Sequence, residues 1–137
     1  MSPNLQRPNG TLVLDSEGLA RAVLQDRNIT RWFVLAQADD SRVITSSATL
    51  VEVIHPRINR AALEWQLSRL TIEPVTEHIA KEAARLLSAA NLHGHRHAID
   101  AMLCATALAS PGPVTILTSA PDDLRMLCGN KATIIKI

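Results

Sequence analysis

The sequence predicts an α/β fold, a sandwich of helices around a mainly parallel sheet, and two observations support this prediction. Short apolar runs of strand length alternate with segments whose apolar residues repeat at helical spacing, a pattern typical of parallel sheets. The chain of 137 residues is also long enough for one domain that buries its own core. Prolines, asparagines and a glycine in residues 1–10 indicate a flexible leader, so the domain is expected to span 11–137.

Capping residues and prolines set the elements of the first half. Ser16 and Ser47 are each suited to cap a helix, because a serine hydroxyl accepts a hydrogen bond from a backbone N–H of the first turn. The helix after Ser47 is expected to stop before Pro56, since a proline disfavours helical geometry in the residue before it. The elements predicted for this half are a strand at 11–15, helices at 16–27 and 30–38, a strand at 42–45, and a helix at 58–70.

The second half continues the alternation. Thr76 is suited to cap a long helix, and the proline within 72–75 makes that segment fit an edge strand. The remaining predicted elements are a helix from about His97 that ends before Pro111, a strand at 114–118, a short helix from Pro121, and a strand at 132–137.

Composition excludes some classes of protein. With two Trp, one Phe and no Tyr, the chain lacks the aromatic platform of many single-strand nucleic-acid binders, which argues against an OB-fold or an RRM. A formal net charge of +1 means that an anionic ligand must be attracted by a local patch of charge.

The two cysteines, Cys104 and Cys128, lie among apolar residues and form no CxxC motif. This pattern predicts buried free thiols and a reducing compartment. Neither a signal segment nor a run long enough to span a bilayer is seen, so we expect a soluble cytoplasmic protein without a membrane partner.

Carboxylates stand where they are energetically costly. Asp15 closes the apolar run 11–14, Glu52 interrupts another apolar segment, and Asp100 follows Ile99 at the start of an apolar helix. No Lys or Arg lies within four residues of Asp15 or of Glu52, although acids are rarely buried without a partner. If these acids meet, they require a cation.

A second acidic candidate, the pair Asp122 and Asp123, follows the strand predicted at 114–118. Parallel strands bring their carboxyl ends to one edge of a sheet, where ligands bind. Clustered carboxylates raise one another's pKa, and Mg²⁺ or Mn²⁺ supplies the missing positive charge through oxygen ligands. Such a site suits metal-dependent phosphodiester hydrolysis.

The order of these motifs resembles the PIN-domain ribonucleases, particularly the VapC toxins of bacterial toxin-antitoxin pairs. The motifs are Leu14-Asp15-Ser16, Leu50-Val51-Glu52-Val53, Ala98-Ile99-Asp100-Ala101, Ile116-Leu117-Thr118-Ser119 and Asp122-Asp123-Leu124. The resemblance implies a PIN-like three-layer α/β/α sandwich and a Mg²⁺- or Mn²⁺-dependent endoribonuclease that is neutralised by a VapB-type antitoxin and forms a homodimer. It also implies that Asp15, Glu52 and Asp100 are metal-site and catalytic acids, with Asp123 as the fourth.

The chain departs from the family pattern at Ala120. The turn here reads Thr118-Ser119-Ala120-Pro121, whereas many family members have an Asp before the proline. Alanine is also a poor N-cap for a helix that starts at a proline. Three alternatives remain open: a naturally weakened enzyme, a substitution that silences a toxic activity, or Asp123 in the vacant role. A weakened PIN domain that mainly binds antitoxin and RNA is therefore the alternative function.

Other polar groups carry weaker signals. A phosphatase of the haloacid-dehalogenase type also uses a strand-end Asp, but Asp15-Ser16-Glu17 lacks the second Asp expected two residues later. His93, His95 and His97 predict a solvated loop, with His95 or Arg96 near Asp100. Residues interpreted either as an RNA-attracting patch or as a solvated helix face are His55, Arg57, Arg60 and Arg69. Residues interpreted either as core or as an antitoxin groove are Trp32, Phe33 and Leu35.

Overall fold

The computed structural model describes residues 9–137, and the leader predicted for residues 1–10 lies almost entirely outside this range. Its last two residues are described, and their backbone forms hydrogen bonds with the segment that leads into the second strand. The Asn9 N–H donates to the Asp40 carbonyl at 3.0 Å, and the Gly10 carbonyl accepts from the Arg42 N–H at 2.9 Å. The chain is therefore anchored before the first strand begins.

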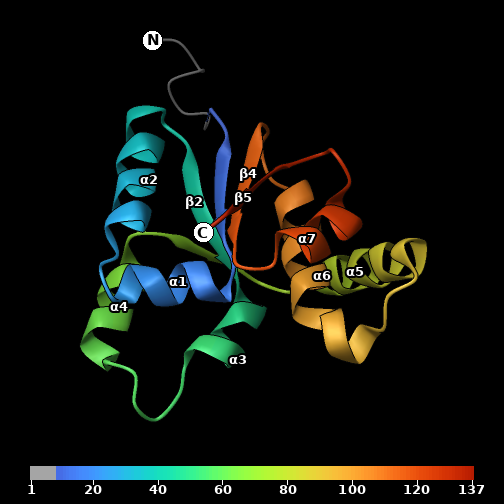
Figure 1. Cartoon of the computed structure of the whole chain (residues 1–137), viewed down its shortest axis with the longest axis horizontal. Coiled ribbons are helices and arrows are strands. Elements are labelled where there is room, and N and C mark those ends of the chain that lie inside the picture. Colours follow the sequence, from blue (N-terminus) through green and yellow to red (C-terminus); the bar gives the residue numbers. More distant parts are fainter. Residues whose placement is uncertain (1–8) are drawn as a thin grey trace.

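Five parallel strands form the central sheet, in the order β3-β2-β1-β4-β5 (Figure 1). Their bounds are β1 Thr11–Leu14, β2 Arg42–Ser46, β3 Thr71–Glu73, β4 Val114–Thr118 and β5 Thr133–Lys136. The first strand lies at the centre, between β2 and β4, and β3 is an edge strand as its proline-flanked sequence predicts. The predicted parallel sheet is confirmed.

Helices cover both faces of the sheet, which confirms the three-layer α/β/α sandwich. Figure 1 shows α1, α2 and α4 on one side and α5, α6 and α7 on the other. Their bounds are α1 Ser16–Val23, α2 Arg27–Ala38, the 3-10 helix η2 Ser47–Thr49, α3 Leu50–Val53, α4 Arg60–Ser68, α5 Glu77–Ala90, α6 Gly94–Leu108 and α7 Pro121–Cys128. No helix within residues 9–137 is long and apolar enough to cross a membrane.

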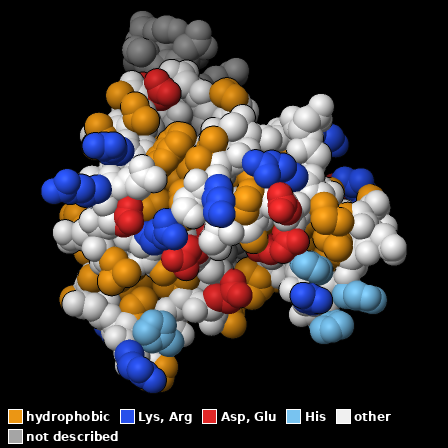
Figure 2. All heavy atoms as spheres, in the orientation of Figure 1, with side chains coloured by type: hydrophobic (Ala, Val, Ile, Leu, Met, Phe, Trp, Pro, Cys, Tyr) orange, Lys and Arg blue, Asp and Glu red, His pale blue; other side chains and the backbone are white. Residues whose placement is uncertain are grey.

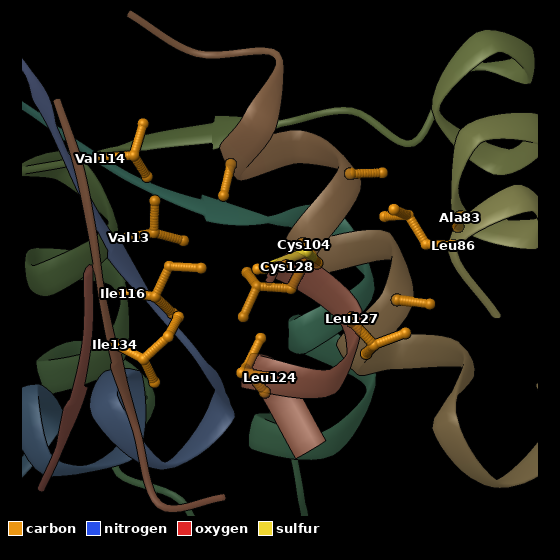
Figure 3. Close-up of a cluster of buried hydrophobic side chains, with 14 of the residues drawn as sticks. Val13, Ala83, Leu86, Cys104, Val114, Ile116, Leu124, Leu127, Cys128 and Ile134 are labelled. Atoms are coloured by element: carbon orange, nitrogen blue, oxygen red, sulfur yellow. A yellow bond between two sulfur atoms is a disulfide. The ribbon is translucent and has the colours of Figure 1, made fainter. Parts of the chain in front are cut away.

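The central strand supplies both halves of the core. Successive side chains of a strand point to opposite faces, so Val13 packs with the helices α5, α6 and α7 while Leu12 and Leu14 pack with α1 and α2. Figure 3 shows Val13 facing Leu124 and Leu127 of α7 across the first of these clusters. Every residue of β1 is buried, and the strand ends directly before Asp15.

The structure corrects several predicted helix starts. Asp15, not Ser16, caps α1, since its carboxylate accepts the Gly18 N–H while its backbone is extended. Ser46, not Ser47, caps the next helical segment. The region around His93 is not a loop up to His97: α6 already begins at Gly94, and His97 sits at a kink with φ −118° and ψ 15°. At the two caps, adjacent residues have similar local propensity, and the structure selects the first of each pair.

The prediction of free thiols is wrong, although the prediction of buried cysteines is confirmed. Cys104 of α6 and Cys128 of α7 form a disulfide, with their Cα atoms 6.1 Å apart and a sequence separation of 24. Their sulfur atoms meet inside the cluster drawn in Figure 3. The pairing depends on how α6 packs against α7, which no spacing motif reveals. It also removes the basis for inferring a reducing compartment.

Candidate metal centre

The site is built where β1 and β4 end side by side. Leu14 of β1 is in register with Leu117 of β4, so Asp15 and the turn after Thr118 emerge at the same edge of the sheet. The Thr118 hydroxyl accepts a hydrogen bond from the Ala120 N–H at 2.9 Å and thereby holds the turn. Two segments that are distant in sequence meet here because the strands are parallel neighbours.

Asp15 is the most buried acid of the site, with 6% of its surface exposed. Its Oδ1 accepts the Gly18 N–H at 2.7 Å and its Oδ2 accepts the Ser119 N–H at 3.1 Å. Burial raises the pKa of Asp15 above its usual value, while these hydrogen bonds and the Thr118 side chain act in the opposite direction. The carboxylate is thus fixed in place by backbone donors of two segments.

Glu52 reaches the site from α3 and is exposed to solvent. Its Oε1 accepts a hydrogen bond from the hydroxyl of Ser16, the first residue of α1. The Ser16 hydroxyl thus contacts Glu52, while Asp15 caps α1.

Asp100 interacts with the other three acids of the site. Burial is the main cause that raises the pKa of Asp100 to about 6; the carboxylates of Asp15, Asp123 and Glu52 act in the same direction, and His97 acts against them. Like charges have this effect only when they are close. The structure therefore brings together all four acids that the sequence singled out.

His97 is a site residue that the sequence reasoning missed. One ligand atom from each of His97, Asp100 and Asp123 can be chosen so that all three lie within 4.8 Å of one another. The His97 Nδ1 lies 4.0 Å from the Asp123 Oδ2, and 15% of the His97 side chain is exposed. His95 and Arg96, which were expected near Asp100, are exposed. The signal for His97 was its spacing of three residues from Asp100, which puts both side chains on one face of a helix.

A cleft of about 720 Å³ opens beside these acids. Asp15, Glu52 and Asp100 line it together with Ala120, whereas Asp123 is not part of its lining. Figure 2 shows acidic side chains gathered in the middle of this face of the molecule, with basic side chains around them. Asp123 thus approaches Asp100 from the α7 side, next to the cleft rather than inside it.

The donor set fits a hard divalent cation. Carboxylate oxygens are the ligands that Mg²⁺ prefers, and Mn²⁺ accepts the same donors. Repulsion from Asp15, Asp123 and Glu52 contributes, after burial, to the raised pKa of Asp100, and a bound cation compensates such repulsion. Ala120 contributes no oxygen from its side chain, so the fit depends on the four acids and His97.

These features define the class of protein: an α/β sandwich that carries an acidic, cation-compatible cleft at the carboxyl edge of a parallel sheet. The family model of the PIN domain matches residues 12–116. The chain belongs to the PIN domain family.

A solved structure shares this fold. A chain in the crystal structure of VapBC2 from Rickettsia felis, bound to a DNA fragment from the promoter, superposes with a TM-score of 0.71 at 17% sequence identity. The match covers 93% of the present chain and 98% of that chain. No curated protein is detectably similar in sequence.

Proposed function

We propose that this PIN domain is a VapC-type toxin, an endoribonuclease that depends on Mg²⁺ or Mn²⁺. The observation that carries the proposal is the convergence of Asp15, Glu52, Asp123 and Asp100, whose mutual repulsion contributes to the raised pKa of Asp100. PIN domains are generally nucleases, and the similar fold in VapBC2 supports a toxin within this family.

The four acids would hold the cation, with His97 beside Asp100 and Asp123. When bound there, Mg²⁺ or Mn²⁺ would supply Lewis acidity, which favours ionisation of water and offsets the negative charge on the phosphate and the leaving oxygen. In the hydrolysis, an oxygen of water bonds to phosphorus, a carboxylate of the cleft accepts the proton, and the bond to the leaving oxygen breaks. Asp15 keeps its position through Gly18 and Ser119, and Glu52 keeps its position through Ser16.

Residues on the far wall of the cleft supply contacts for an RNA backbone. His55, Arg57 and Asn59 line the cleft from the segment between α3 and α4, and Arg57 forms no ion pair within residues 9–137. An arginine can donate two parallel hydrogen bonds to a phosphate. Of the three arginines noted in the sequence, Arg57 is the one that lines the cleft, which supports it as the contact to the scissile strand.

The proposal includes a VapB-type antitoxin as partner and a homodimer as the assembly. Apolar side chains beside the cleft support a protein partner: Leu24 is 80% exposed and Val51 is 77% exposed. Phe33 is buried and Trp32 packs against the same cluster, so these two residues belong to the core, while Leu35 is 57% exposed. Co-expression with the antitoxin, followed by size-exclusion chromatography with light scattering, tests both the partner and the dimer.

The alternative function, a weakened PIN domain that mainly binds antitoxin and RNA, keeps one specific observation in its favour. Ala120 lines the cleft at the position where a fourth carboxylate is expected, and Asp123 does not line it. Both the ribonuclease and the weakened domain would bind RNA, so only a measurement of RNA cleavage distinguishes them.

Cleavage of single-stranded RNA under single-turnover conditions with Mn²⁺ tests the proposal. We expect cleavage that EDTA abolishes and that Asp100→Asn slows at least about 100-fold, because the variant removes a metal-binding carboxylate. The exposed Glu64→Gln is the matched control for loss of one negative charge. Equal cleavage by wild type and Asp100→Asn indicates a contaminating nuclease, and RNA binding without metal-dependent cleavage supports the alternative.

A further inference from the structure

A second cleft, of about 560 Å³, lies where the end of α1, the first half of α2 and the second half of α4 meet. Its lining consists of Gln25, Arg27, Thr30, Arg31, Trp65, Gln66 and Arg69, and none of these residues lines the acidic cleft. Basic side chains stand on the flank of the molecule where Figure 1 places α2 (Figure 2). Since the lining holds three arginines and no acid, its field attracts an anionic ligand.

The floor of this cleft contains a polar group without a partner. Gln66 is 4% exposed, and its Oε1 is the one buried side-chain atom within residues 9–137 that has no hydrogen-bond partner. Buried polar atoms in folded proteins are nearly always bonded. The terminal torsion of glutamine is soft, so the oxygen can turn toward a donor that enters the cleft. A ligand with an N–H group satisfies it.

Arg69 and Trp65 form a rigid wall. The Arg69 guanidinium carbon lies 4.7 Å from the ring centroid of Trp65 and 5.0 Å from that of Phe33, distances at which cation–π attraction holds a guanidinium in place. Trp65 is 53% exposed, so ring surface remains for a planar group to stack on. Unspecific binders of single-stranded nucleic acid combine these two features, a positive groove and an aromatic stacking surface.

We propose that this second cleft binds a nucleotide of single-stranded RNA. Its phosphate lies against Arg27 and Arg31, its base stacks on Trp65, and an N–H on the base edge donates to the Gln66 Oε1. An acidic peptide also matches the charge, but the exposed indole and the position of the cleft favour RNA.

The position of the cleft links it to the acidic site, and in this respect the inference rests on the proposed ribonuclease function. Along α4, Ala62 lines the acidic cleft, while Trp65 and Gln66 line the second cleft. From Ala62 to Gln66 the helix rises about 6 Å, a separation that a few nucleotides span. The second cleft would thus hold the RNA strand on the flank of the acidic cleft, a few nucleotides from the scissile bond.

Fluorescence of Trp65 reports on the second cleft directly. The chain has two tryptophans, so Trp32→Phe leaves Trp65 as the only one. In EDTA, which prevents cleavage, we expect a 12-nucleotide single-stranded RNA to quench this fluorescence saturably. Anisotropy of the same RNA with a fluorescein label gives a second measurement on the unmodified chain, which does not depend on the Trp32→Phe variant.

Two variants test the proposed contacts. Arg31→Ala should weaken binding about tenfold, as expected for a charged hydrogen bond, and should reduce the slope of log K against log salt by about 0.7. Gln66→Leu should weaken binding about fivefold while leaving that slope unchanged, because no charge is lost. Arg85→Ala is the matched control: Arg85 lies on α5, pairs with Glu82 and should leave binding unchanged.

The outcomes separate this inference from the proposed function. Quenching that survives in Asp100→Asn but is weakened in Arg31→Ala and Gln66→Leu supports the nucleotide site, whether or not the chain cleaves RNA. Wild-type binding by both second-cleft variants overturns the site and leaves the ribonuclease proposal intact. If an aspartate-rich peptide quenches Trp65 fluorescence with higher affinity than the RNA, the nucleotide site is also overturned, because the cleft then binds protein.

Discussion

The carboxylate of Asp15 accepts a hydrogen bond from the backbone N–H of Ser119, although 104 residues separate them in sequence. This bond joins the end of β1 to the turn after β4. Ala120 follows directly in that turn and lines the acidic cleft. One carboxylate therefore has two roles: it fixes the geometry of the site and contributes charge to it.

The structural role of Asp15 can be separated from its charge by comparing Asp15→Asn with Asp15→Ala. Both variants remove the same negative charge, so relief of repulsion with Asp100 cancels in the comparison. Asparagine can still accept the Gly18 N–H that Asp15 accepts at 2.7 Å, whereas alanine leaves α1 without a cap. We expect Asp15→Ala to be less stable than Asp15→Asn by about 1 kcal/mol. Urea denaturation in EDTA measures the difference, and equal midpoints would contradict the capping role.

The raised pKa of Asp100 predicts how stability depends on pH in metal-free protein. The pKa is about 6 in the folded chain against 3.8 for an unperturbed Asp, so between these values the folded state binds more protons than the unfolded state. Stability from this group therefore falls as pH rises from about 4 through 6. Asp100→Asn removes the effect, and we expect it to be more stable than wild type at pH 7.5 and equal to it near pH 4.

Thermal denaturation in EDTA across this pH range measures the effect. Glu64→Gln, a change at an exposed position, is the control and should follow wild type throughout. Added Mg²⁺ should reverse the order at pH 7.5, since a ligand stabilises the folded state that binds it and Asp100→Asn loses a carboxylate. If Mg²⁺ stabilises Asp100→Asn as much as it stabilises wild type, Asp100 is excluded as a metal ligand.

Ala120 offers a gain-of-function test. It occupies the N-cap of α7 without a side-chain hydrogen bond. Ala120→Asn adds a cap without charge, and we expect it to raise the free energy of unfolding by about 1 kcal/mol without a change in Mn²⁺ affinity. Ala120→Asp adds both the cap and a carboxylate in the cleft, so it should also bind Mn²⁺ more tightly and cleave RNA faster. Titration of free Mn²⁺ by electron paramagnetic resonance distinguishes them; unchanged Mn²⁺ affinity in Ala120→Asp would eliminate the idea of a missing ligand.

Local signals in the sequence were sufficient for most of the fold. The strand predicted at 114–118 has the bounds observed for β4, because its apolar run is bounded by turn residues. Thr76 caps α5 as predicted, with its hydroxyl accepting the Ile79 N–H at 3.2 Å. Both features depend only on residues near in sequence, which is why they can be recognised without tertiary information.

Features that depend on tertiary contacts could not be recognised in this way. Asp15 and Ser16 are both good N-caps; in the structure Asp15 caps α1, and the Ser16 hydroxyl instead contacts Glu52, which is distant in sequence. The spacing of His97 from Asp100 was available in the sequence, but the packing that brings Asp123 of α7 beside His97 was not. The meeting of Asp15 with the turn after 114–118 followed from the parallel strands, whereas the full set of four acids was implied by a family resemblance. Their roles in metal binding and catalysis stay predictions.

The disulfide between Cys104 and Cys128 predicts a stability that depends on redox conditions. Closing a loop of 24 residues restricts the unfolded chain and should contribute about 3 kcal/mol to stability, which dithiothreitol should remove. The double variant Cys104→Ala with Cys128→Ala is the control and should not respond to dithiothreitol, and thiol titration of the unfolded, unreduced chain should find no reactive cysteine. The bond joins the helices that carry Asp100 and Asp123, yet Leu103, Leu124 and Leu127 are nearly fully buried between them. We expect this packing to persist after reduction, so Mn²⁺ affinity should change far less than stability. A parallel loss of both would show that the disulfide itself holds the site together.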